Sequence, residues 1–386
     1  MLAVVTLATG VSQSFGRFTY GLLLTDVRTD LTISNTVAGT LGSANLAAYL
    51  AGSLIVSLVV GRLGLRTVSR TGIVVVTAGL IVLASGASPL LVALGLVMTG
   101  LGAAGVWVTA PGLAIAELGP ERRATAIGVV TAGVGLGMVS ASYLDAVMDW
   151  RGVYRVEAAV AVVVAVLVST ILRRPVPALG RRVGGLTAIR QVPGWRPLLW
   201  SYGVYATALA IVATFMVALL EEDAGYAPTE AAVAFSLLGV GTVAGGPLFG
   251  PIADRFGRSI ALGGALGTMM VAATVIASGH RPGAALAAFG FGTAFTGVPV
   301  SVGARIGDFV EGDRFGAAYG VATLAFGAGL TVGPQLGGAL SDLTGSFRPA
   351  FAVATGCVLL AVALVPAATR APAGRGGPPV GNLRSS

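Results

Sequence analysis

Three polar residues interrupt the first apolar stretch of the chain. Gln13, Arg17 and Tyr20 are spaced by four and three residues, so a helix would carry all three on one face. Arg17 is the only formal charge between residues 2 and 24. A guanidinium fork matches a carboxylate bidentately. If this stretch crosses a bilayer, the pattern predicts an anion receptor that faces a protein interior or a wet cavity.

A second polar face follows in the next apolar stretch. Asn45, Tyr49 and Ser53 stand at i, i+4 and i+8, and such a face should turn inward because lipid offers an amide no partner. We predict that Asn45 and Tyr49 join Arg17 in one site, with Tyr205 as a wall from the second half of the chain. The alternative is a purely structural staple, in which Gln13, Asn45 and backbone carbonyls satisfy Arg17.

The composition indicates that the helices carrying these residues lie in a membrane. Of the 386 residues 55% are hydrophobic and 10% are charged, against about 25% charged in soluble domains. Glycine is abundant, with 58 residues, as expected where helices pack closely in lipid. The net charge of +8 is scattered between apolar stretches, so we attribute it to membrane topology and expect no nucleic-acid partner.

Twelve apolar stretches are long enough to span a bilayer. The turn Ser85–Pro89 is expected to separate the third and fourth. The polar insertion 173–196 divides the twelve into six and six. The stretches are 2–24, 36–60, 71–88, 89–116, 124–147, 153–172, 197–220, 230–253, 259–279, 283–304, 315–340 and 348–369.

The arginines indicate an orientation. With the N-terminus in the cytoplasm, 18 of the 24 basic residues lie in inner connections and five in outer ones, in agreement with the positive-inside rule. We therefore expect both termini to be cytoplasmic. The expected domains are an N-terminal six-helix bundle 1–172, a cytoplasmic linker 173–196, a C-terminal six-helix bundle 197–370 and a cytoplasmic tail 371–386.

An internal repeat supports a pseudo-symmetric all-α membrane fold of twelve transmembrane helices. Two blocks recur at offsets close to half the chain length. Arg122, Gly128, Thr131, Gly135 and Gly137 match Arg314, Gly320, Thr323, Gly327 and Gly329, and Ala51, Gly52, Arg62 and Gly64 match Ala244, Gly245, Arg255 and Gly257.

A charged turn follows the eighth stretch and contains Gly250, Asp254, Arg255, Gly257 and Arg258. Glycine permits a tight turn there, and Asp254 can pair with a nearby arginine. The pattern resembles the G-x-x-x-D-R-x-G-R signature of the major facilitator superfamily of transporters. The resemblance implies two six-helix bundles around a central cavity, and a conformational latch formed by these residues.

Two further patterns refine the resemblance. Phe15–Leu23, Asp30–Leu31, Ala38–Gly39 and Ser43–Gly52 resemble the start of the YbfB/YjiJ-type branch of that superfamily, which implies a carrier of the bacterial inner membrane. Gly329–Gly338 contains a Gly-Pro step and resembles an antiporter motif found in another helix. The counterpart helix in the first half has no Gly-Pro step, and bending and close packing of a helix also explain the pattern, so we do not carry over an antiporter assignment.

The sequence offers little for other chemistry. It has one Cys and one His and no acid pair, metal cluster or nucleophile–base set, so we expect no enzyme activity and no cofactor. A coupling proton usually needs an acid at membrane depth. Asp145 and Glu157 are the nearest candidates, and both are expected at the membrane interface.

We therefore predict a monomeric secondary or facilitative carrier that moves a small anionic or zwitterionic organic solute by alternating access. The alternative is an efflux carrier for hydrophobic compounds, in which Arg17 is structural and the aromatic residues bind the cargo. Whether transport is coupled to protons stays open at this stage.

Overall fold

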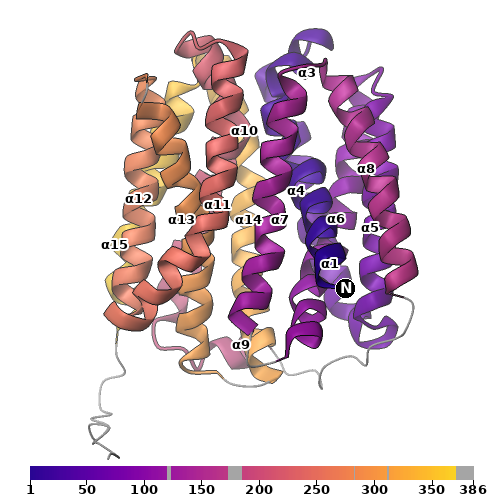
Figure 1. The fold of residues 1–386 in the computed structure, drawn as a ribbon. Helices are drawn as coiled ribbons and strands as arrows, with labels where there is room; N and C mark the ends of the chain where they lie inside the picture. The colour runs from indigo at the N-terminus through magenta and orange to yellow at the C-terminus, as the bar shows by residue number, and fades with distance from the viewer. Residues whose placement is uncertain (120–122, 173–184, 282, 311–312, 371–386) are drawn as a thin grey trace, which may run out of the picture.

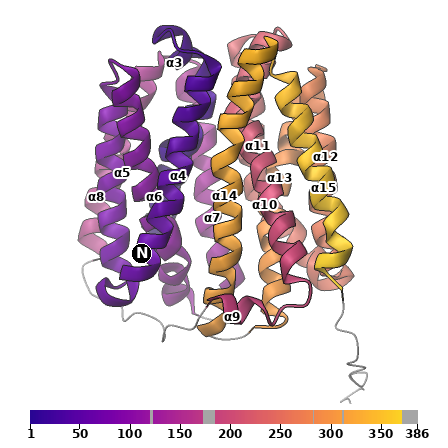
Figure 2. The ribbon, with the colours of Figure 1, turned by 180° about the vertical axis from the view of Figure 1, so that it is seen from behind.

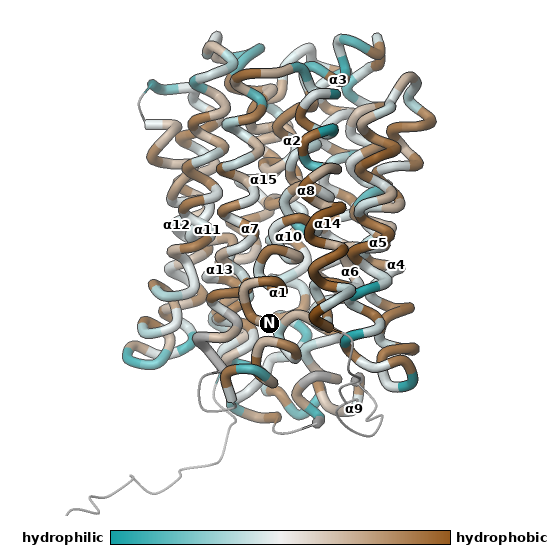
Figure 3. The backbone as a smooth tube through the Cα atoms, turned by 45° about the vertical axis from the view of Figure 1, so that its right-hand side comes forward, coloured by the Kyte–Doolittle hydropathy of each residue, from teal (hydrophilic) through white to brown (hydrophobic). Residues whose placement is uncertain are grey.

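The computed structural model describes residues 1–119, 123–172, 185–281, 283–310 and 313–370. Within these ranges the regular structure is helical throughout, and long helices stand roughly side by side (Figure 1). Apolar residues cover the middle of the helices, and polar residues gather toward their ends (Figure 3). The linker residues 173–184 and the tail residues 371–386 lie outside the described ranges.

The first apolar stretch is divided into several short elements. It comprises α1 (Leu2–Thr9), the π-helical segment η1 (Gly10–Phe18), α2 (Thr19–Leu22) and α3 (Leu24–Asp30). The other elements of this half are α4 (Asn35–Leu63), α5 (Leu65–Ala84), α6 (Pro89–Leu118), α7 (Arg123–Asp145) and α8 (Trp150–Ile171).

The second half begins with the short helix α9 (Gly185–Ile189). It continues with α10 (Trp195–Ala218), η3 (Leu219–Asp223), α11 (Pro228–Phe256), α12 (Arg258–Ser278), α13 (Gly283–Gly307), α14 (Asp313–Thr344) and α15 (Arg348–Ala368). Ten helices in the described ranges are long and apolar enough to cross a membrane. The sequence predicts twelve spans. The first stretch is too fragmented to count as one such helix, and α7 is also not among the ten.

Local sequence signals explain where the helices break. Ser88 caps α6 by accepting a hydrogen bond from the Leu91 N–H, with Pro89 in the first turn, which confirms the predicted break between the third and fourth stretches. Gly64 and Gly257 separate α4 from α5 and α11 from α12, with φ of 79° and 92°. These are conformations that glycine adopts without strain.

The two halves repeat the same packing pattern. The helix α6 packs against both α4 and α5, and α13 packs in the same way against α11 and α12. The halves meet mainly along α4 with α14 and along α7 with α11, as the two opposite views show (Figures 1 and 2). We call the two ends of the bundle the α3 end and the α9 end, after the short helices found there.

Glycine allows the closest helix contacts within each half. A Cβ on Gly292 of α13 would lie 2.0 Å from the Leu238 carbonyl oxygen of α11, which is too close for any side chain. We expect Gly292→Ala to lower the free energy of unfolding by about 3 kcal/mol, the upper end for overpacking. Thermal unfolding in detergent measures this loss.

Gly356→Ala is the matched control, because its Cβ would have no neighbour within 4 Å. Gly→Ala in an unhindered helix is neutral or mildly stabilising. Equal melting temperatures for the two variants would contradict the close α11–α13 contact.

Candidate functional site

The candidate site is built on the π-helical segment η1. All its residues from Gly10 to Gly16 are buried, although the segment carries Ser12, Gln13 and Ser14. π-Helical turns are rare and frequently mark functional sites, because they widen the helix and redirect side chains. The sequence pattern predicts a helix here, but it contains no signal for the wider turn.

Arg17 projects from η1 and is only half-buried. Its Nη1 donates a hydrogen bond to Gln13 Oε1 at 2.6 Å, which is the Gln13 contact that the structural alternative expects. Its guanidinium carbon lies 4.1 Å from the centre of the Tyr49 ring and 5.6 Å from that of Phe18. These are cation–π distances, which partly compensate a desolvated cation.

The charge of Arg17 has no counter-ion among the described residues. Arg17 forms no ion pair with any of them, and its buried Nε has no hydrogen-bond partner there. A buried or half-buried charge is normally paired. The arrangement leaves donors of Arg17 available to an anion.

Asn45 does not satisfy Arg17, contrary to the structural alternative. Its amide nitrogen donates instead to the carbonyls of Gly16 and Leu96 and to Thr99 Oγ1, at 2.9, 2.7 and 3.0 Å. Asn45 therefore ties η1 and α4 to α6. Its Oδ1 is buried without a partner among the described residues, so one acceptor remains free in the site.

The two other predicted tyrosines have occupied hydroxyls. Tyr20 Oη donates to the Ala38 carbonyl at 2.9 Å and fastens α2 to α4. Tyr205 Oη donates to the Phe295 carbonyl at 2.8 Å, and its ring stacks with Tyr202 and Phe326. Tyr20 lines the cavity beside Arg17, whereas Tyr205 is not among the lining residues.

A small cavity of about 30 Å³ lies between the two halves at this point. Besides Arg17, Tyr20 and Asn45, the first half supplies Phe18, Gly21, Gly42 and Leu46, and the second half supplies Leu209, Ala210, Ala213, Thr214 and Leu330. The second-half wall is almost entirely apolar. Sequence reasoning missed these residues, because a small apolar side chain that faces a cavity looks like any other core residue.

Polar contacts between the halves concentrate at the α3 end. Arg28 pairs with Glu222 at 2.7 Å, and the Asn35 and Thr36 N–H groups donate to Asp342 at 2.9 and 2.7 Å. Farther down α4, the hydroxyls of Thr40 and Ser43 contact Gln335 at 2.6 and 2.9 Å. We call these contacts the α3-end seal. They join the halves above the Arg17 cavity.

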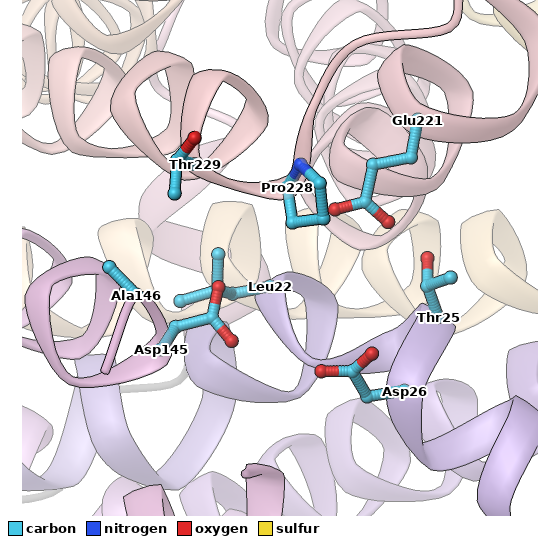
Figure 4. Close-up of a pocket in the computed structure, with 8 residues that line it drawn as sticks. All are labelled: Leu22, Thr25, Asp26, Asp145, Ala146, Glu221, Pro228 and Thr229. Carbon is cyan, nitrogen blue, oxygen red and sulfur yellow. The ribbon is translucent and has the colours of Figure 1, made fainter. Parts of the chain in front are cut away.

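A second, larger cavity of about 110 Å³ lies at the α3 end. Figure 4 shows the carboxylates of Asp26, Asp145 and Glu221 turned toward this space, together with Thr25. Asp26 and Asp145 come from the first half and Glu221 from the second. Burial and the neighbouring carboxylate of Asp149 raise the pKa of Asp26 above its usual value, because both disfavour its charged form.

Glu157 lies deeper in the bundle than Asp145. It is fully buried, eight residues into α8 and thus about 10 Å below the start of that helix. Its Oε1 accepts a hydrogen bond from Thr19 Oγ1 at 2.7 Å. The periodicity of α8 alone could not show how deeply its first turns are embedded. Asp145 is the last residue of α7, close to the expected position.

The predicted latch residues form an ion-pair cluster inside the second half. Arg258 bonds to Asp254 Oδ1 at 2.7 Å and to both Asp308 oxygens at 3.1 Å, which joins the ends of α11 and α13 to the start of α12. Arg255 is exposed. Asp308, which sequence reasoning missed, lies 50 residues further on and carries no motif.

We expect Arg258→Ala to cost only about 1 kcal/mol of stability, because exposed ion pairs contribute little. If the cluster controls conformational exchange, the same change should reduce the transport rate severalfold. Thermal unfolding and uptake by the same protein preparation separate the two effects. A loss of uptake no larger than the loss of folded protein would contradict a latch role.

Comparisons with known proteins agree with this architecture. Residues 7–366 match the family described as "Uncharacterised MFS-type transporter YbfB". The solved structure of a point mutant of the nucleoside transporter NupG is 13% identical and superposes with a TM-score of 0.74, covering 96% of this chain and 100% of that one. A search among curated proteins found no match. The chain is not an enzyme but a multi-pass membrane protein with the major facilitator fold, and it belongs to the YbfB family of MFS-type transporters.

Proposed function

We propose that this transporter carries a small organic anion or zwitterion by alternating access and that Arg17 is its anion receptor. The carrier acts as a monomer in the bacterial inner membrane, with both termini cytoplasmic. Twelve spans form two six-helix bundles, 1–172 and 197–370, joined by the linker 173–196. In this arrangement the α3 end faces outward and the α9 end faces the cytoplasm.

The observation that carries the proposal is the uncompensated guanidinium of Arg17. It lies in a cavity between the halves, it forms no ion pair with the described residues, and its nearest polar partner is the neutral amide of Gln13. A staple that only fastened helices would be expected to satisfy its donors. A site for an anion must leave some of them open.

The surrounding groups suit a small ligand with a carboxylate. Tyr49 covers one face of the guanidinium, which holds its plane and leaves its edge for a bidentate contact. Asn45 Oδ1, buried in the cavity wall without a partner in the described structure, is an acceptor for an ammonium or hydroxyl group. The pairing of one cation with one acceptor favours amino acids and hydroxy acids over larger anions.

The cavity has to enlarge before it can hold such a ligand. A volume of about 30 Å³ accommodates one or two water molecules. The site lies between halves that the α3-end seal holds together, so relative movement of the halves would both open the site and break the seal. Transporters with this kind of repeat work by rocking one half against the other.

An efflux carrier for hydrophobic compounds is the second candidate. The apolar wall formed by Leu209, Ala213 and Leu330 and the edge-on contact of Phe18 with Phe295 across the halves, with ring centres 5.5 Å apart, favour it. Under this candidate Arg17 is structural, and cargo binds to the aromatic and aliphatic surface.

A ligand-stabilisation screen tests the proposal. A ligand present at 100 times its Kd raises the unfolding free energy by about 2.7 kcal/mol. We expect small carboxylates or amino acids to raise the melting temperature of the purified wild-type protein and to leave that of Arg17→Ala unchanged. Hydrophobic compounds that stabilise both proteins equally would instead favour efflux and contradict the anion receptor.

A further inference from the structure

One face of α8 carries a line of buried polar groups. Trp150, Tyr154 and Glu157 stand at i, i+4 and i+7 and are 3%, 1% and 0% exposed. The opposite face carries Val160, Val163 and Val166, each at least 40% exposed, as expected for a helix that contacts lipid there. The line starts at the α3 end with Trp150, whose buried indole N–H has no hydrogen-bond partner among the described residues, and it ends at Glu157.

The polar atoms along this line are not satisfied by the described part of the protein. Glu157 Oε2 and Tyr154 Oη are buried and have no hydrogen-bond partner there. Buried polar groups are almost always paired with protein or with internal water, and such water typically makes about three hydrogen bonds. Two unpartnered oxygens on successive turns of one helix therefore indicate a hydrated polar path into the first half.

Glu157 has no cation beside it among the described residues. Its one hydrogen-bond partner there is the Thr19 hydroxyl, and the titratable group that interacts with it is the phenol of Tyr154. Arg66 and Arg70 lie near the start of α5, toward the α9 end, and Arg17 of η1 forms no ion pair with Glu157. Asp145, at the end of α7, is an acid and therefore does not supply a positive charge to Glu157 either. A buried carboxyl without a cation is stable only in the neutral form.

Glu157 is linked to the Arg17 site through α2. Thr19 opens α2 directly after η1, two residues beyond Arg17, and the next residue, Tyr20, lines the Arg17 cavity. An ionised Glu157 would need further donors, which only movement of α2 or entry of water can supply. Its protonation state and the position of α2 are thus coupled.

We propose that Glu157 is the proton-binding site of this carrier and that it holds its proton while the α3 end is closed and releases it when that end opens. Hydronium entering along the Trp150–Tyr154 face gives one proton to Oε2 and leaves as water. On opening, the carboxylic O–H returns the proton to water, and the resulting carboxylate keeps the Thr19 hydrogen bond. The inference rests on the proposed alternating access and adds a protonation that controls the α3 end. Because the proton enters and leaves at that end, this cycle moves no net proton across the membrane.

Infrared spectroscopy of the full chain in liposomes tests proton binding without any solute. The C=O stretch of protonated carboxylic acids should contain a component at neutral pH that disappears as pH rises, and Glu157→Gln should lack this component at every pH. Glu117→Gln, which removes an exposed glutamate at the α9 end, is the matched control and should keep the band. A band in Glu157→Gln equal to the wild-type band at every pH would overturn the proposal.

Spin labels test the link to conformation. In a Cys357→Ser background, Leu90→Cys and Leu343→Cys place labels on exposed positions of the two halves at the α3 end, where the leucines are 78% and 81% exposed. We expect the distance between the labels to lengthen as pH rises, and to stay short at every pH in Glu157→Gln. A pH response unchanged by Glu157→Gln would overturn the coupling.

The acidic cavity at the α3 end provides the necessary comparison. Asp145→Asn and Glu221→Gln remove acids that face each other across the halves, and we expect both to keep a pH response. If either abolished it as fully as Glu157→Gln, the assignment to Glu157 would be overturned.

If Glu157→Gln does not fold, Glu157→Asp, which keeps an acid on a shorter side chain, can be measured instead. Glu157→Asp should retain a titrating band at a changed midpoint, and a band identical to wild type would argue against the assignment. None of these measurements needs the solute, so failure of the anion receptor and failure of the proton site are distinguishable.

Discussion

Arg17→Ala should abolish transport of the ligand that the stabilisation screen identifies. Removing one partner of a desolvated charge pair costs roughly 2–5 kcal/mol, which is about 30-fold to several thousand-fold in affinity. Arg17→Lys should keep part of the uptake, because it retains the charge and loses the bidentate fork. Uptake of labelled ligand into proteoliposomes measures both variants.

Arg62→Ala is the matched control for this experiment. Arg62 lies in the last turn of α4 and is exposed, so its loss removes one arginine without touching the cavity. Wild-type uptake by Arg17→Ala would eliminate the anion receptor. Poor folding of Arg17→Ala without any ligand-specific defect would assign Arg17 a structural role.

Gly39→Ala should prevent the α3 end from closing. A Cβ on Gly39 of α4 would lie 2.2 Å from the Pro334 carbonyl oxygen of α14. The obstacle is backbone, which no rotamer change relieves. Closure would then cost about 2 kcal/mol more, a roughly 30-fold shift toward the open state. The label pair on Leu90 and Leu343 should report a longer distance, and uptake should fall accordingly.

Gly61→Ala on the same helix is the control, because a Cβ there meets nothing within 4 Å. It should leave both the label distance and uptake as in wild type. Gly39→Ala differs from Gly292→Ala in kind: it obstructs contact between the halves, so the melting temperature should change little. A large loss of stability with an unchanged label distance would contradict this distinction.

Some features of the site follow from the sequence because they are local. The spacing of Gln13 and Arg17 places them one turn apart on one helix face, and a hydrogen bond joins them there. Gly257 predicts a tight turn, and its φ is 92°. In both cases the atoms that decide the outcome lie within a few residues of each other.

Other features depend on contacts between distant segments, which periodicity cannot supply. Asn45 has the predicted inward position, but its amide donates to the Leu96 carbonyl and the Thr99 hydroxyl of α6 rather than pairing with Arg17. The Tyr205 hydroxyl is taken by the Phe295 carbonyl. The polar line on α8 has the same helical spacing as Gln13, Arg17 and Tyr20, and that signal could have placed Glu157 inside the bundle.

The packing of α14 gives its glycine-rich segment a structural role. Gly329 and Gly333 bring α14 against α10, and Gly338 brings it against the start of α4. Close packing therefore explains these glycines within the described structure. The sequence could not decide between packing and an antiporter motif, since both require small residues at the same spacing.

Asp342 illustrates how weakly the α3-end seal can hold the two halves together. Its carboxylate accepts from the first two N–H groups of α4, so the cap of a helix in one half is supplied by the other half. When the halves part, water can replace each of these hydrogen bonds. The net free energy of such exchangeable bonds is small. The closed and open states can therefore remain nearly equal in population, and modest binding energies suffice to switch between them.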